Sequence, residues 1–183
     1  LRAEPVDVPE PETVDRFLPP LNPSAVVDPR EPRTFHAVTS PEYFTEFKQQ
    51  QFAAAAGAER VAREVSAEFA QVFGRTWPLT ESFMVEDAET VLVAAGTSAG
   101  TCRHVVRQLR AQGKKVGLVR VRMFRPFPYA DIRAMLGRAK NVAVLDRSVS
   151  PGADSPLCQE VKSALYGLDG GSAAPRVYGF VAG

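Results

Sequence analysis

The sequence predicts an α/β protein with three layers, in which a mostly parallel five-stranded sheet carries helices on both faces, preceded by an extended N-terminal arm. Two observations lead to this prediction. From about residue 83, short apolar runs alternate with amphipathic helical patterns, as in chains that build parallel sheets. The run Val91-Leu-Val-Ala-Ala95 is apolar throughout, which is typical of a strand buried on both faces.

The arm is predicted from proline content. Residues 1–34 contain eight prolines, and proline at this density prevents a long helix and favours extended backbone. Phe17, Leu18 and Leu21 are its bulky apolar residues, so we expect them to anchor the arm on a neighbouring surface.

A helical pattern follows the arm. Ser40 is placed as the N-cap and Pro41 as the first helical residue, and Gly74 is expected to end the pattern. We expect Gly57 to divide the stretch 41–73 into two helices.

The remaining elements are predicted from hydrophobic periodicity and turn residues. They are an antiparallel edge strand at 82–85, strands at 91–95, 116–124, 142–145 and 177–181, and helices at 101–112, 129–136 and 155–166.

These patterns divide the chain into an extended arm over residues 1–40, a helical connection over 41–80 and an α/β domain over 81–183. The chain begins with Leu1 and ends inside a strand pattern. We interpret it as a piece of a longer polypeptide. The alternative is a natural C-terminal strand.

Composition excludes several classes of protein. The hydrophobic content of 45% and charged content of 23% are ordinary for a globular protein. Apolar runs are too short for a membrane span, and the acidic, proline-rich start is unlike a signal peptide, so a cytoplasmic location is expected. Cys102 and Cys158 lie far apart without a Cys-x-x-Cys motif, and we predict no metal site.

Positive charge is concentrated in one window. Residues 101–147 hold twelve Lys and Arg residues against two acids, a net charge of +10. One face of the helix in this window carries four of the cations, spaced i, i+4, i+7 and i+11: Arg103, Arg107, Arg110 and Lys114. This stripe is either a solvated face or a docking surface for an acidic protein or another subunit. Nucleic acid is disfavoured because few aromatic residues interleave with the cations.

The turn Gly96-Thr-Ser-Ala-Gly100 matches the Gly-x-Ser-x-Gly pattern of a nucleophile elbow. A serine hydrolase of that type needs a histidine later in the chain, and the last histidine, His104, lies only six residues after Ser98. We therefore predict no catalytic residue here. The turn either caps the next helix through Thr97 or Ser98, or offers the N–H groups of Gly96, Thr97 and Ser98 to an anion.

Several charged residues lie at or beyond the predicted strand ends. Arg120 and Arg122 share one face of their strand, and Arg125 and Arg147 follow strand ends, where open α/β sheets bind ligands. These arginines either form salt bridges within the protein or contact an anionic ligand, and the sequence leaves both alternatives open. Asp146 either organises its own turn or takes part in chemistry.

Four motifs in order carry a resemblance to a known family: Glu86-Asp-Ala-Glu-Thr-Val-Leu-Val-Ala-Ala-Gly96, Lys115-Val-Gly-Leu-Val-Arg-Val-Arg-Met-Phe-Arg-Pro-Phe-Pro128, Val144-Leu-Asp-Arg-Ser-Val-Ser-Pro-Gly152 and Glu160-Val-Lys-Ser-Ala-Leu-Tyr166. Together they resemble the alpha subunit of 2-oxoacid:ferredoxin oxidoreductases of the multi-subunit pyruvate synthase type. The Asp154-Ser155-Pro156 stretch departs from the glycine-rich loop expected there.

The resemblance implies a transketolase C-terminal-like domain in an enzyme that decarboxylates a 2-oxoacid, acylates coenzyme A and reduces ferredoxin. It also implies that thiamine diphosphate, Mg²⁺ and the iron–sulfur clusters are held by other domains or subunits. This piece is then a non-catalytic structural domain, inactive alone, that packs against other subunits. The alternatives are the C-terminal domain of a related thiamine-dependent dehydrogenase beta subunit or transketolase, or a stand-alone anion- or nucleotide-binding module.

Overall fold

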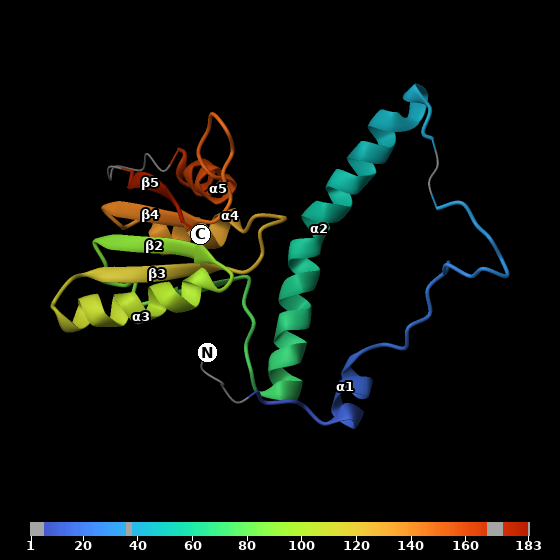
Figure 1. Ribbon diagram of the computed structural model, residues 1–183, viewed down its shortest axis with the longest axis horizontal. Coiled ribbons are helices and arrows are strands. Elements are labelled where there is room, and N and C mark those ends of the chain that lie inside the picture. Colours follow the sequence, from blue (N-terminus) through green and yellow to red (C-terminus); the bar gives the residue numbers. More distant parts are fainter. Residues whose placement is uncertain (1–5, 36–37, 168–173, 183) are drawn as a thin grey trace. The chain divides into compact units, whose positions relative to one another are not determined.

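The structure, a computed structural model, describes residues 6–35, 38–167 and 174–182, and it divides into two compact units, Leu1–Trp77 and Pro78–Gly183 (Figure 1). Among the described residues, no helix combines the length and apolar character that crossing a membrane requires.

The described residues of the first unit form two helices. The long helix α2 (Pro41–Phe73) runs without interruption, so the predicted break at Gly57 is wrong. A single glycine lowers helix propensity by about 1 kcal/mol but keeps its backbone N–H, and the alanines at 53–56 favour the helix on its N-terminal side. The helix ends as predicted at Gly74, whose φ of 65° lies in the left-handed region.

Part of the predicted arm is helical. The short helix α1 (Pro11–Phe17) begins with proline at a position where a helix needs no N–H donor. The ring of Phe17 lies edge-on to those of Phe69 and Phe73 of α2, with centroids 5.8 and 5.2 Å away. Leu18 and Leu21 are exposed, so Phe17 is the anchor within this unit.

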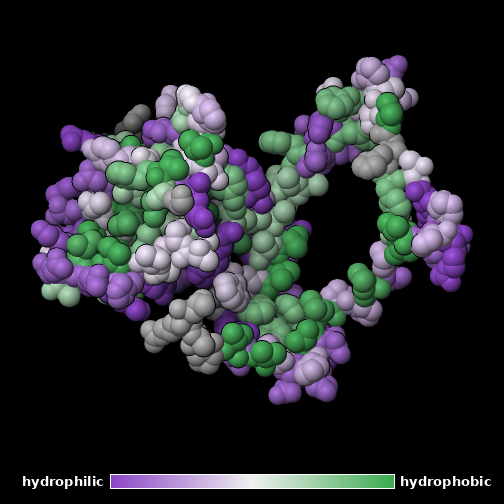
Figure 2. All heavy atoms as spheres, viewed as in Figure 1, coloured by the Kyte–Doolittle hydropathy of each residue, from purple (hydrophilic) through white to green (hydrophobic). Residues whose placement is uncertain are grey.

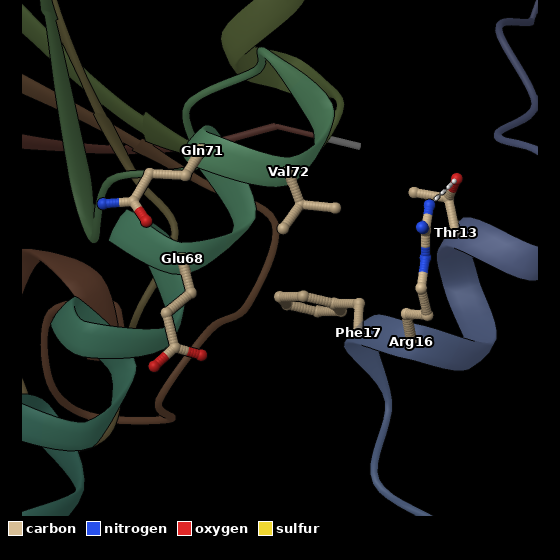
Figure 3. A pocket seen from close by; sticks show the side chains of 6 residues that line it. All are labelled: Thr13, Arg16, Phe17, Glu68, Gln71 and Val72. Atoms are coloured by element: carbon tan, nitrogen blue, oxygen red, sulfur yellow. Dashed lines mark hydrogen bonds between the residues drawn. The ribbon is translucent and has the colours of Figure 1, made fainter.

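Beside Phe17 lies a hollow between α1 and α2, with Val72 on its α2 side (Figure 3). Most of α2 remains at the surface, and none of its residues is buried in this structure. Apolar side chains therefore remain on its surface (Figure 2). The exposed ones include Phe44, Phe47 and Phe52.

The second unit is an α/β fold (Figure 1). Its strands are β1 (Thr80–Phe83), β2 (Thr90–Ala95), β3 (Val116–Val121), β4 (Asn141–Asp146) and β5 (Arg176–Val181), and its helices are α3 (Ser98–Ala111), α4 (Tyr129–Leu136) and α5 (Pro156–Leu165). The strand order is β1-β3-β2-β4-β5, with β1 antiparallel to β3 and the other pairs parallel. The predicted fold class and the antiparallel edge strand are confirmed.

Helices cover the two faces of the sheet unequally. Alternate residues of β2 point to opposite faces, so Val91 and Val93 join the apolar cluster beneath α4 and α5, whereas Ala94 joins the cluster beneath α3. The α5 helix begins where Ser155, its N-cap, accepts a hydrogen bond from the backbone N–H of Cys158.

A close backbone approach joins β1 to β3. Met84, just after β1, has a φ of 55°, which is unusual for a residue with a side chain. Its carbonyl oxygen lies 2.5 Å from the place where a Cβ on Gly117 would sit. Glycine is therefore required at position 117, because any larger residue meets the backbone of the turn.

Candidate functional site at the carboxyl edge of the sheet

The strand order defines a topological switch point. From β2 the chain crosses to β3 on one side, and from β3 it passes back over β2 to β4 on the other side. Sheets of this kind bind ligands at the carboxyl edge where neighbouring strands diverge. The turn at Gly96 follows β2 and Arg147 follows β4, so the structure brings these predicted residues to that edge.

The turn after β2 uses its hydroxyl group internally. Gly96 has a φ of 60°, and the Oγ of Ser98 donates a hydrogen bond to the carbonyl oxygen of Ala95 at 2.7 Å. Thr97 is the N-cap residue of α3, but neither its side chain nor that of Ser98 makes a capping hydrogen bond. A contact between this turn and an anion stays a prediction.

Asp146 organises the turn after β4. Its two carboxylate oxygens accept hydrogen bonds from the backbone N–H groups of Ser148 and Leu157, each at 3.0 Å. Burial raises the pKa of Asp146, but the backbone N–H donors, Arg147 among them, outweigh burial and hold the pKa below its usual value. The carboxylate thus ties β4 to α5, while the side chain of Arg147 is exposed.

Arg125 forms a salt bridge. Its Nη2 lies 2.7 Å from a carboxylate oxygen of Glu160 on α5, and its guanidinium stacks over the ring of Phe124. The hydroxyl of Tyr129 donates to the other oxygen of Glu160 at 2.6 Å. This hydrogen bond is the main reason that the pKa of Tyr129 is raised, with burial second. An anion contact by Arg125 stays a prediction.

The basic stripe of α3 faces β1 and the turn after it. Arg103 pairs with Glu81, and its guanidinium lies 4.9 Å from the ring centroid of Phe83. Arg107 approaches the same ring at 5.5 Å. Lys114 is exposed.

Arg110 makes several contacts with this region. It donates to the carbonyl oxygens of Val116 at 2.5 Å and Met84 at 2.6 Å, and it forms an ion pair with Asp87 at 2.7 Å. The pairing with Asp87 raises the pKa of Arg110 and lowers that of Asp87. Part of the stripe therefore has an internal role, holding the edge strand and its turn against α3, and docking by the stripe stays a prediction.

Glu81 pairs with two arginines, and the sequence analysis did not identify it. It lies opposite Arg120 in the antiparallel register, contacts Arg103, and accepts a hydrogen bond from Arg122 at 2.6 Å. Directly opposite residues in such a pair share a face of the sheet. The edge strand was predicted at 82–85, which leaves Glu81 outside it. A strand that begins at Thr80 puts Glu81 and Phe83 on one face, beside the basic strand 116–124, and predicts this cluster.

The remaining candidates for chemistry are metal-ligating side chains and the two cysteines. Across the described ranges, no group of three or more His, Cys, Asp and Glu side chains is arranged to hold a metal ion. Cys102 and Cys158 are buried free thiols, and burial raises the pKa of both. Since the thiolate is the nucleophile, neither cysteine is poised to react.

A family model, the pyruvate:ferredoxin oxidoreductase core domain II, matches residues 88–183. The chain belongs to this family. The resemblance that the four motifs carry is therefore confirmed, and the matched region includes β2 to β5 with the turns after β2 and β4.

Curated relatives agree with this assignment. The pyruvate synthase subunit PorA of Methanothermobacter thermautotrophicus is 37% identical over 98% of this chain and 45% of its own length. PorA of Thermotoga maritima is 39% identical over the same shares. The ketoisovalerate oxidoreductase subunit VorA of Pyrococcus abyssi is 38% identical over 85% of this chain and 40% of its own length. This chain therefore spans less than half the length of these relatives.

Among solved structures, a 2-oxoglutarate:ferredoxin oxidoreductase from Magnetococcus marinus matches 69% of this chain and 20% of its own chain. The identity is 22% and the TM-score 0.45, a likeness too slight to bear on the fold or on ligands.

Proposed function

We propose that this chain is a non-catalytic structural domain of a 2-oxoacid:ferredoxin oxidoreductase, in which it completes subunit packing and helps to wall the active site. The family match over residues 88–183 carries the proposal. The side chains at the carboxyl edge support it, because Ser98 and Asp146 are committed to turns and Arg125 to an ion pair.

The complete enzyme, in this proposal, decarboxylates a 2-oxoacid such as pyruvate, acylates coenzyme A and passes electrons through iron–sulfur clusters to ferredoxin. Thiamine diphosphate, Mg²⁺ and the clusters are bound by other domains and subunits. The names of the relatives support this reading, because pyruvate synthase and ketoisovalerate oxidoreductase subunits both match most of the chain. The isolated chain is then inactive.

The test uses the full-length polypeptide co-expressed with the other subunits of its enzyme. Deleting the segment 88–183 is expected to abolish assembly and 2-oxoacid-dependent ferredoxin reduction together. Asp146→Asn is expected to leave kcat of the assembled enzyme within about threefold, because a group that only organises a turn is absent from the transition state. A hundredfold loss of kcat in fully assembled Asp146→Asn enzyme would assign this domain a catalytic role.

We also propose that the basic window 101–147 docks an acidic partner, which is another subunit, ferredoxin or coenzyme A, through its exposed cations. Arg107 and Lys114 are the suitable probes, since both are exposed, whereas Arg103 and Arg110 hold β1 and its turn. Reversing Arg107 and Lys114 to Glu is expected to weaken assembly or turnover at low salt, where exposed charges are least screened. Unchanged assembly and kinetics under those conditions would contradict docking by this face.

A further inference from the structure

Two guanidinium groups pair with one carboxylate where β1, β3 and α3 meet, and a third arginine lies opposite that carboxylate's residue in the sheet. Arg103 reaches the cluster from α3, Arg120 from the end of β3, and Arg122 from just beyond that strand. Glu81 contacts Arg103 and Arg122 and lies opposite Arg120 in the sheet register. These four groups define the Glu81 cluster.

The Glu81 cluster carries an excess of positive charge. Three arginines and one glutamate give a net charge of +2, and the side chains are only partly exposed, at 34% for Arg103, 20% for Arg122 and 25% for Glu81. Like charges in a partly buried site repel each other more strongly than in water. Burial first, and then the charges of Arg120 and Arg103, lower the pKa of Arg122.

The guanidinium of Arg120 has an unsatisfied hydrogen-bond donor. Its Nε is buried and has no hydrogen-bond partner in the structure. A buried donor without a partner costs about 1–3 kcal/mol, so such groups in folded proteins call for an explanation. An anion that reaches this guanidinium removes the cost and part of the repulsion at once.

The position of the cluster favours a ligand. Arg120 is paired with Ala94 in the register of β2 and β3, one residue before the end of β2. The turn at Gly96 follows directly, and its backbone enters α3 at Ser98. The Glu81 cluster therefore lies beside the carboxyl edge of the parallel strands, where α/β sheets bind ligands.

We propose that the Glu81 cluster binds a phosphate group, with Arg103, Arg120 and Arg122 as its ligands. A phosphate or phosphate monoester carries about −1.5 to −2 charges at pH 7, which matches the net positive charge of the cluster. A single carboxylate would compensate only half of that charge. The planar fork of arginine suits phosphate oxygens. This site goes beyond the structural role proposed for the domain, and that role does not require it.

The test is a titration of the 183-residue chain with inorganic phosphate and, separately, with glycerol 3-phosphate, at constant ionic strength. Binding is followed by calorimetry and by the ¹⁵N resonances of the arginine Nε groups. Either probe is expected to shift the Nε resonance of Arg120 saturably. Tighter binding of the ester assigns the phosphate to a small-molecule ligand, and tighter binding of the inorganic ion assigns it to free phosphate.

Two charge-matched variants separate a site from general attraction. Arg120→Gln is expected to weaken phosphate binding at least about tenfold, the usual effect of losing charge-assisted hydrogen bonds. Lys114→Gln removes the same charge from the exposed end of the stripe and is expected to change affinity less than about twofold. Equal losses in the two variants, or no saturable binding by the wild-type chain, would overturn the proposal.

The wild-type resonance shift decides the matter even if Arg120→Gln does not fold. An Nε resonance of Arg120 that ignores saturating phosphate also refutes the site. Because the measurement uses the isolated chain, its outcome is separate from enzyme assembly, which tests the structural role.

Discussion

Two faces of one sheet are attached to their helices in different ways. Beneath α4 and α5, sixteen of the described residues form one buried apolar cluster, whereas five do so beneath α3. On the α3 side, Arg103, Arg107 and Arg110 add ion pairs, hydrogen bonds to carbonyl groups and contacts with the ring of Phe83. One face is thus held by apolar burial, and the other combines a small core with directional contacts from guanidinium groups.

The difference has a consequence for function. An apolar cluster stabilises a face without leaving polar groups that a ligand can use. A face held by arginines needs matching anions, and the Glu81 cluster has fewer carboxylates than guanidiniums. The α3 side is therefore where we expect anionic ligands to act, and the α4–α5 side is where we expect most of the stability to reside.

The largest expected effect tests the apolar face. Leu136→Ala on α4 is expected to lower the free energy of unfolding by about 2–5 kcal/mol, because the residue is fully buried in the large cluster. Leu118→Ala makes the same chemical change at 1% exposure beneath α3 and is expected at the low end of that range. Urea unfolding followed by circular dichroism measures both. A Leu118→Ala cost equal to or above that of Leu136→Ala would reverse the comparison.

The second test concerns the junction that brings the edge strand to the sheet. Gly117→Ala places a Cβ 2.5 Å from the carbonyl oxygen of Met84 and is expected to cost about 1–3 kcal/mol, as overpacking does. Gly100→Ala is the matched control, since no atom lies within 4 Å of its Cβ position and the residue is helical. We expect the control to be neutral or to stabilise by up to about 1 kcal/mol. Thermal unfolding of the two variants gives the comparison. Similar melting temperatures would show that the turn after β1 moves to accommodate the added Cβ without a loss of stability.

A third test isolates the arginine contacts. Arg110→Gln removes two hydrogen bonds to carbonyl oxygens and is expected to cost about 1–2 kcal/mol. Arg107→Gln, which loses a ring contact on the same helix, is expected to cost less. Hydrogen exchange of the β1 amides should accelerate in Arg110→Gln. If exchange at β1 were unchanged in this variant, Arg110 would not hold the edge strand.

The smallest effect is a pH dependence at the turn after β4. Because the folded pKa of Asp146 lies below its unfolded value of about 3.9, its contribution is full above that pH and is lost as the pH falls through the folded pKa. Asp146→Asn is expected to cost about 1 kcal/mol at pH 7, and the difference from wild type should shrink below pH 4. Urea unfolding between pH 3 and 7 measures it, with exposed Glu46→Gln as control. A difference that stayed constant across this range would exclude Asp146 as its source.

Element positions were largely predictable because they depend on local periodicity. The helix predicted at 129–136 is α4 itself, and the predicted antiparallel edge strand is β1, two residues earlier than expected. Failures came where tertiary packing or backbone energetics outweighed a local signal. Gly57 did not break α2, and α1 formed inside a proline-rich stretch, where Phe17 packs on α2.

The candidate site residues also include some whose positions the sequence predicted and others whose contacts it did not. The positions of Gly96 and Arg147 at the sheet edge follow from the alternation of strands and helices, and sequence alone placed both beyond strand ends. The ion-pair partners of Arg103 and Arg110 did not follow, because Glu81 and Asp87 come from β1 and the turn after it, more than twenty residues away in the sequence.

By itself, the sequence determined the fold class, the family and the concentration of positive charge. Periodicity, motif order and charge count can be read along the chain without knowing which distant segments pack together. The tertiary structure decided what that charge does. Only the antiparallel pairing of β1 with β3 sets Glu81 opposite Arg120, and only the packing of α3 on that edge brings Arg103 to the same carboxylate. Pairing between distant segments is set by the global packing of the sheet, and so the Glu81 cluster was visible only in the folded chain.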